Sequence, residues 1–141
     1  MDNSHHLELP AKLESLEAFS ELVSRCAENA GVDTKKHMQI AISLEEVLVN
    51  IINYSYVDTE GKITVKCSTE SKNRFIVTII DSGVPFNINT SGPPDLTSDI
   101  SERAVGGLGI HLVKEMMDEV HYHREKNQNI LKLIIDMKKE D

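Results

Sequence analysis

The feature that most constrains the fold is a helical stretch, residues 33–54, that is apolar on nearly every side. Asp33 or Thr34 can cap its start, because a short polar side chain accepts hydrogen bonds from the free backbone N–H groups there. A helix that is apolar all round must be covered by other elements. We therefore predict that it is the most buried helix of the chain. Its apolar residues are Met38, Ile40, Ala41, Ile42, Leu44, Val47, Leu48, Val49, Ile51 and Ile52.

One narrow polar stripe interrupts this helix. Its members recur at intervals of three and four residues, which places them on one side. The stripe is either a solvated edge or a surface that faces a polar ligand. Its amides, hydroxyl and carboxylate favour the ligand, because the other solvent faces of the chain use Lys and Glu freely. The stripe consists of Gln39, Ser43, Glu46, Asn50 and Asn53.

Glu46 and Asn50 are the pair within the stripe that could carry chemistry. They lie one helical turn apart, so their side chains can converge on one point. An amide oxygen on Mg²⁺ and a carboxylate that holds a water or a hydroxyl would suit a phosphate at that point. Glu45 points about 100° away and is expected on the surface.

Two glycine-containing motifs follow this helix along the chain. Asp81, at the end of an apolar strand, has a well-fixed backbone, while Gly83 allows another group to approach closely and Phe86 is expected to fold back as a hydrophobic plug. The segment 106–109 opens a later helix with unblocked N–H groups, which favour anions. Each motif alone can be a plain turn or a flexible helix lead-in. Their order after Glu46 and Asn50 makes a nucleotide pocket the better interpretation.

The remaining pattern predicts one domain, residues 1–141, that contains both strands and helices. Apolar residues at every third or fourth position predict a helix over 11–29, with Gly31 as its stop. Alternation predicts antiparallel strands over 62–68 and 74–80, joined by a hairpin turn. The polar segment 87–103 is predicted to be a loop. The other expected elements are a short strand 7–9, a helix 109–120 and two final strands, 120–124 and 130–137.

Composition excludes several functions. The formal charge of −8 repels nucleic acid and anionic membranes, so neither is expected as a direct partner. No apolar run is long enough to span a membrane and the N-terminus lacks the pattern of a signal peptide, so we expect a cytoplasmic protein.

The cysteines and histidines receive structural interpretations. Cys26 and Cys67 are expected to be two reduced thiols in the core. His121 and His123 share one face of a strand, as a zinc pair could, but no third ligand stands at a helpful spacing. We therefore do not expect a metal there.

The motifs, with their order and spacing, resemble those of the GHKL ATPase superfamily, named for gyrase, the heat-shock chaperone, histidine kinases and MutL. Glu46 and Asn50 match its N box, Asp81-x-Gly83 its first glycine box, and Gly106-x-Leu108-Gly109 its second. The short, single-domain architecture is most similar to the bacterial anti-sigma-factor serine/threonine kinases. The likeness spans nearly the whole chain.

This resemblance implies a Bergerat fold. Such a fold is an α/β (α+β) two-layer sandwich, in which a mixed, mostly antiparallel sheet carries about three helices on one face and holds ATP on the helical side beneath a lid. It also implies that Asn50 binds Mg²⁺, Asp81 accepts from the adenine amino group and Glu46 is the general base. The nucleotide-binding residues that it implies are Asn50, Asp81, Gly83, Phe86, Arg103, Gly106, Gly107, Leu108 and Gly109.

The function implied by the resemblance is that of an ATP-dependent serine/threonine protein kinase that doubles as an anti-sigma factor. Its substrate would be a hydroxyl on a STAS-type anti-anti-sigma partner, it would sequester a sigma factor, and it could form a homodimer. Three positions depart from the family pattern. Tyr54 replaces a usual His, the stretch Gln128-Asn129-Ile130 stands where the last strand often carries a Thr, and Arg103 is offset by a residue or two.

Two other functions fit the same motifs. One is a nucleotide-gated binding module without phosphotransfer, in which ATP orders the lid and selects a partner. The other is the ATP-binding half of a histidine-kinase-like system, although no dimerising helix or phosphoacceptor His precedes the core. Glu46 separates the kinase from the module, because a binder does not need a general base.

Overall fold

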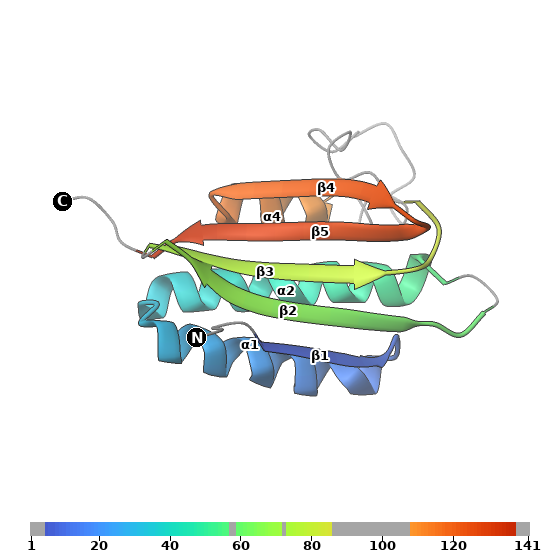
Figure 1. Ribbon diagram of the computed structural model, residues 1–141, viewed down its shortest axis with the longest axis horizontal. Coiled ribbons are helices and arrows are strands. Elements are labelled where there is room, and N and C mark those ends of the chain that lie inside the picture. Colours follow the sequence, from blue (N-terminus) through green and yellow to red (C-terminus); the bar gives the residue numbers. More distant parts are fainter. Residues whose placement is uncertain (1–4, 57–58, 72, 86–107, 138–141) are drawn as a thin grey trace.

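The computed structural model describes residues 5–56, 59–71, 73–85 and 108–137. These residues form one five-stranded sheet with helices on one face (Figure 1). The predicted two-layer fold is therefore confirmed. The elements are β1 (His5–Pro10), a 3-10 turn (Leu13–Ser15), α1 (Leu16–Ala30), α2 (Thr34–Tyr54), β2 (Lys62–Glu70), β3 (Arg74–Asp81), α4 (Leu108–Met116), β4 (Glu119–Glu125) and β5 (Gln128–Asp136).

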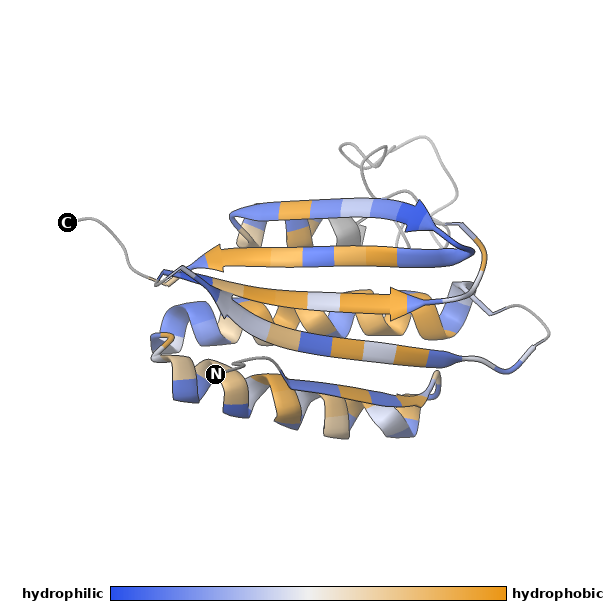
Figure 2. Cartoon of the chain, in the orientation of Figure 1, coloured by the Kyte–Doolittle hydropathy of each residue, from blue (hydrophilic) through white to orange (hydrophobic). Residues whose placement is uncertain are grey.

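The sheet order is β1-β2-β3-β5-β4, and every pairing is antiparallel. The central strand β3 pairs with β2 through Val65 opposite Ile79, and with β5 through Ile79 opposite Leu131. Apolar residues cover most of β3 and β5 (Figure 2). Alternate side chains of these strands face the helices and are buried, which creates the core.

The predicted central helix, α2, has more buried residues than α1. Ile40, Leu44 and Leu48 are fully buried against the sheet. Met38 is 60% and Ile42 39% exposed. The expectation that α2 is covered on nearly every side is therefore wrong for the face that carries Met38 and Ile42. The sheet and the neighbouring helices leave this face exposed. No helix in the described part of the chain is long and apolar enough to cross a membrane.

Two helix boundaries differ from the prediction. The first helix begins at Leu16 instead of Ala11, after a 3-10 turn, and ends at Gly31 in the left-handed region (φ 87°), as expected of a glycine stop. The last helix ends at Met116 instead of Val120. Asp118, which lies between the helix and β4, is bonded to β5, because its N–H donates to the Ile134 carbonyl at 2.9 Å and its carboxylate accepts from the Asp136 N–H at 2.6 Å.

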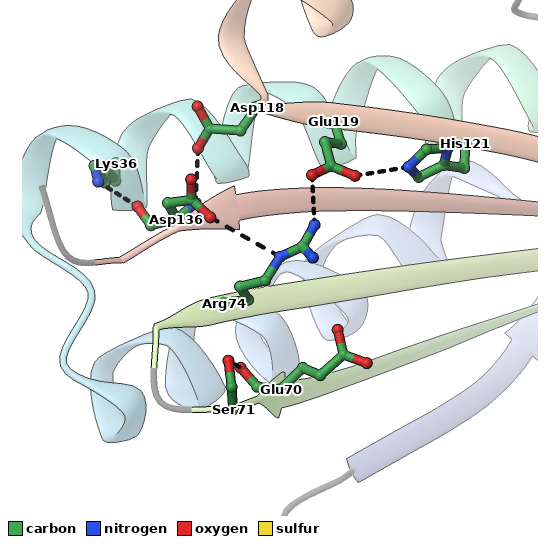
Figure 3. Close-up of polar contacts among 8 residues, drawn as sticks. All are labelled: Lys36, Glu70, Ser71, Arg74, Asp118, Glu119, His121 and Asp136. Carbon is green, nitrogen blue, oxygen red and sulfur yellow. Dashed lines mark hydrogen bonds and ion pairs between the residues drawn. The ribbon is translucent and has the colours of Figure 1, made fainter.

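A polar cluster joins four elements at the end of the sheet where β3 begins (Figure 3). The Arg74 guanidinium donates to Glu119 at 2.7 Å and lies 3.9 Å from the Asp136 carboxylate. Lys36 of α2 donates to the Asp136 carbonyl. His121 and then Arg74 lower the pKa of Glu119.

The two histidines considered as a zinc pair contact carboxylates instead. His121 lies 2.8 Å from Glu119, and His123 lies 3.0 Å from Glu125. Among the described residues, no group of three or more side chains gathers in a way that could hold a metal ion.

The cap of α2 yields a test of stability. Asp33 accepts a hydrogen bond from the Lys36 N–H at 2.9 Å, so Asp33→Ala leaves that donor without its side-chain partner. We expect the free energy of unfolding to fall by about 1 kcal/mol. Asp33→Asn keeps an accepting oxygen and should unfold within a few tenths of a kcal/mol of the wild type. Urea unfolding measures both. Equal losses in the two variants would show that charge, and not capping, is what Asp33 contributes.

Candidate functional site

Asp81 ends β3 on the helical face of the sheet and is only 4% exposed. Its side-chain atom Oδ1 accepts a hydrogen bond from the Gly83 N–H at 2.8 Å and another from Asn129 Nδ2 at 2.9 Å. Both hydrogen bonds therefore have the same acceptor, Oδ1 of Asp81. The carboxylate is thus held in one orientation, with Oδ2 as its second acceptor.

The side chain of Asn129 connects the members of this polar group by hydrogen bonds. Its Nδ2 donates to Asp81 and to the Val84 carbonyl at 2.8 Å. Its Oδ1 accepts from the Tyr122 hydroxyl at 2.6 Å and from Arg124 at 3.1 Å. The side chain of Asn129 therefore has partners at both ends, and it is 3% exposed. This network fixes Asp81 from a neighbouring strand.

Arg124 extends the network by donating to the Gly83 carbonyl at 2.9 Å. Sequence reasoning missed both Arg124 and Tyr122 as contributors to the site. They alternate along β4 with the exposed His121 and His123, so the strand pattern placed them on the opposite, inner face. That alternation was the signal in the sequence that could have indicated their inward orientation. Which residue of β5 each of them contacts follows only from the register of β4 on β5.

The segment after β3 is held against the end of α2. The Val84 N–H donates to the Ser55 carbonyl at 2.8 Å. A Cβ on Gly83 would lie 2.2 Å from the same carbonyl oxygen, which is too close for any side chain. The group that approaches Gly83 is therefore protein backbone, and glycine allows Asp81 to lie beside the end of α2.

Tyr56 makes a second connection at this end of α2. Its hydroxyl donates to the Lys62 carbonyl at 2.6 Å and accepts from the Ser82 N–H at 2.7 Å. Burial raises the pKa of the Tyr56 hydroxyl, and the charge of Asp81 raises it further, while the hydrogen bond from Ser82 lowers it. Tyr56 thus joins α2, β2 and the end of β3.

A small cavity of about 110 Å³ lies between the end of α2 and the segment after β3. Asn50, which is 7% exposed, and Tyr54 line it from α2, and Val84 and Pro85 line it from the other side. A cavity of this size admits an ion or a few waters and is smaller than a whole nucleotide.

A larger cavity, of about 730 Å³, lies at the same end of the sheet. Thr64 and Ile80 line it, and they alternate with the buried Ile63 and Ile79 that face the helices. Asp81, Gly83 and Arg124 line it as well, so residues of both faces of the sheet border this cavity. Of the two cavities, Asn50 lines the smaller and Asp81 the larger, and Val84 and Pro85 line both, so the candidate site includes both cavities.

The polar stripe of α2 has two kinds of member. Ser43 and Asn50 are buried, so the solvated-edge interpretation is wrong for them, whereas Asn53 is exposed. Ser43 contacts the Met116 sulfur of α4 at 3.9 Å. Glu46 is half-buried and Glu45 exposed, as the helical spacing indicated.

The structure brings three of the predicted site residues to one end of the sheet: Asn50, Asp81 and Gly83. Glu46 lies one turn before Asn50 on the same helix. Leu108 and Gly109 form the first turn of α4. Phe86, Arg103, Gly106, Gly107 and the predicted loop 87–103 lie outside the described residues.

Comparison with known proteins shows the family to which the chain belongs. Residues 9–135 match the family described as histidine kinase-like ATPase domain. The serine-protein kinase RsbW of Bacillus mycoides is 28% identical over 131 residues, which cover 89% of this chain and 80% of the relative. The RsbW of Listeria monocytogenes is 27% identical over 130 residues, with 89% and 82% covered.

Two solved structures share the fold. The RsbU and RsbW domains of Rv1364c from Mycobacterium tuberculosis superpose with a TM-score of 0.66 at 14% identity, over 94% of this chain and 32% of that one. The SiaB-SiaC complex from Pseudomonas aeruginosa gives 0.62 at 13% identity, over 94% and 89%. At these identities, the likeness shows the fold alone.

The network around Asn129 yields a test. Asn129→Ala removes the donor to Asp81 and the acceptor of Tyr122 and Arg124 in a buried place, so we expect a loss of about 3 kcal/mol in the free energy of unfolding. Gln128→Ala, next to it but exposed, should change stability by less than about 0.5 kcal/mol. Chemical denaturation measures both. A loss below about 1 kcal/mol for Asn129→Ala would mean that water replaces the side chain and that the network is not structural.

Proposed function

The chain belongs to the histidine kinase-like ATPase domain family, and we propose that it is an ATP-dependent serine/threonine protein kinase that acts in the cytoplasm as an anti-sigma regulatory factor. Its similarity to serine-protein kinases over most of the chain supports this function. The observation that carries the proposal is the buried, oriented carboxylate of Asp81. It lies beside the end of α2, the helix that carries Asn50 and Glu46.

Asp81 is suited to recognise adenine. An ionised carboxylate only accepts hydrogen bonds, and the exocyclic amino group of adenine donates them. Because Gly83 and Asn129 both bind Oδ1, the oxygen Oδ2 is the acceptor that the site can present. Burial strengthens such a contact, because water competes with it poorly.

Asn50 is suited to hold the metal ion of a nucleotide. Its amide lies at the small cavity, and an amide oxygen is a normal ligand for Mg²⁺, which keeps several waters and takes few protein ligands. ATP bound with Mg²⁺ would supply the phosphoryl group. The helical N-terminus at Leu108 and Gly109 would favour the negative phosphates.

Glu46 is the proposed general base. It lies one turn from Asn50, half-buried, and its carboxylate makes no hydrogen bond or ion pair with another described residue. A carboxylate in that position can orient a serine or threonine hydroxyl and take its proton as the phosphoryl group is transferred.

The proposed partners follow from the family resemblance. A STAS-type anti-anti-sigma protein would carry the phosphorylated hydroxyl. The same chain would sequester a sigma factor and could form a homodimer. The name serine-protein kinase, borne by the relatives, supports a protein hydroxyl as the acceptor. The similarly folded SiaB was solved in complex with SiaC, which supports a protein partner for this fold.

Nucleotide binding is tested by calorimetry. We expect wild-type protein to bind ATP and ADP with Mg²⁺, and Asp81→Asn to bind at least tenfold more weakly, since an amide presents the wrong mix of donor and acceptor and a hydrogen bond to a charged group contributes about 1.5–3 kcal/mol. Asp136→Asn, at the opposite end of the sheet, is the matched control and should bind as wild type does. No heat at millimolar nucleotide with the wild type would sink the proposed ATP site.

Phosphotransfer is tested at Glu46. Glu46→Gln is nearly isosteric, so ATP affinity should stay within a few fold while transfer to a STAS partner falls about 10²- to 10⁴-fold. Glu45→Gln, on the exposed side of the same helix, should leave both unchanged. Radiolabel transfer and nucleotide affinity are measured on the same preparations. If wild-type protein binds ATP and partner but transfers no phosphate, the chain is a nucleotide-gated binding module instead.

A further inference from the structure

Cys26 and Cys67 lie far apart in the sequence and come together at one cavity. Cys26 is on α1 and is half-buried, whereas Cys67 is on β2 and is 1% exposed. Both line a cavity of about 340 Å³ between the end of α1 and the strands. Helix α1 packs directly on β2, so the two thiols are held by rigid elements (Figure 1).

The two thiols are neighbours at this cavity. Burial raises the pKa of the Cys67 thiol strongly, and a hydrogen bond with Cys26 raises it further. Cys67 therefore remains protonated at neutral pH and is a poor first target for an oxidant. Cys26 is the more accessible thiol of the pair, because it lies at the cavity and is only half-buried.

Cys26 and Cys67 do not belong to a metal site formed by the described residues. His5, which is paired with Cys67 across β1 and β2, also lines the cavity. Yet no group of three or more His, Cys, Asp or Glu side chains in the described ranges is arranged to hold an ion. The chemistry available to the pair is therefore that of two neighbouring thiols.

We propose that Cys26 and Cys67 form a dithiol modification site that a hydroperoxide oxidises to an intramolecular disulfide. The Cys26 sulfur first attacks the peroxide, the O–O bond breaks, and a sulfenic acid and water form when the substrate is hydrogen peroxide. The Cys67 sulfur then attacks the sulfenic sulfur, forming the S–S bond and releasing a second water. The protein loses two hydrogens, and the peroxide is reduced.

The second step is favoured by the fold. The Cys67 thiol lines the same cavity as Cys26, so its attack is intramolecular and has a high effective concentration. Thiol reductants reverse the bond by exchange. The resulting link would join α1 to β2 covalently. Because the link closes a long segment of chain that includes α2, we expect it to raise the melting temperature by roughly 5–10 °C.

This site is independent of the proposed kinase function. The cavity is lined by Ala30, Ser71 and Met137, near the start of β3, whereas Asn50 and Asp81 lie toward the opposite end of that strand. The inference can therefore be tested whether or not the chain binds ATP.

The test is stoichiometric oxidation of the full chain with hydrogen peroxide, followed by intact mass and iodoacetamide counting under non-reducing conditions. We expect a monomer that has lost two hydrogens and both reactive thiols, melts roughly 5–10 °C higher, and returns to the starting mass with dithiothreitol. Peptide mapping should recover Cys26 joined to Cys67.

Two single variants complete the experiment. In Cys67→Ala, Cys26 should be trapped as a sulfenic acid by dimedone, and no rise in melting temperature should follow. In Cys26→Ser, Cys67 should keep its thiol under the same treatment. Thermal unfolding of the reduced variants shows that each is folded. Disulfide-linked dimers, or separate oxidation of each thiol to a sulfinic acid in the wild type, would overturn the proposal.

Discussion

The burial of a carboxylate at the end of the central strand is the constraint on which this end of the molecule depends. Asp81 closes β3, which is paired on both sides and covered by helices. A charge placed there costs several kcal/mol unless hydrogen bonds compensate it. The Gly83 N–H and the Asn129 amide supply that compensation. Asn129 in turn accepts hydrogen bonds from Tyr122 and Arg124, so the carboxylate of Asp81 is connected through β5 to β4.

The same constraint determines how α2 meets the sheet. Since Gly83 has no Cβ, the Ser55 carbonyl can lie against it, and Tyr56 then reaches both β2 and Ser82. Asn50 thereby arrives next to the segment after β3. The amide and the carboxylate belong to elements that are far apart in the sequence but rigid. Little conformational entropy remains to be lost when a ligand binds between them.

Much of this fold could be predicted from single residues and local periods. The Gly31 stop, the Asp33 cap and the hairpin between β2 and β3 are local signals, and each is present in the structure. The start of α1 and the end of α4 were not predictable in this way. Asp118 leaves the helix because of hydrogen bonds to Ile134 and Asp136, and such partners are invisible to a pattern confined to one segment.

At the candidate site, too, contacts between distant segments could not be predicted from local patterns. Asn50, Asp81 and Gly83 could be proposed from the sequence because the order and spacing of their motifs are informative in combination. Asn129, Tyr122 and Arg124 could not, since each is an ordinary strand residue whose role depends on register. Asp81 opposite Asn129 and Asn129 opposite Arg124 are cross-strand pairs, and a shift of one residue would turn these side chains to the other face of the sheet. The apolar pairs of β3 and β5 oppose such a shift, because it would expose Ile79 and Leu131. The hydrophobic core therefore maintains the polar geometry of the site.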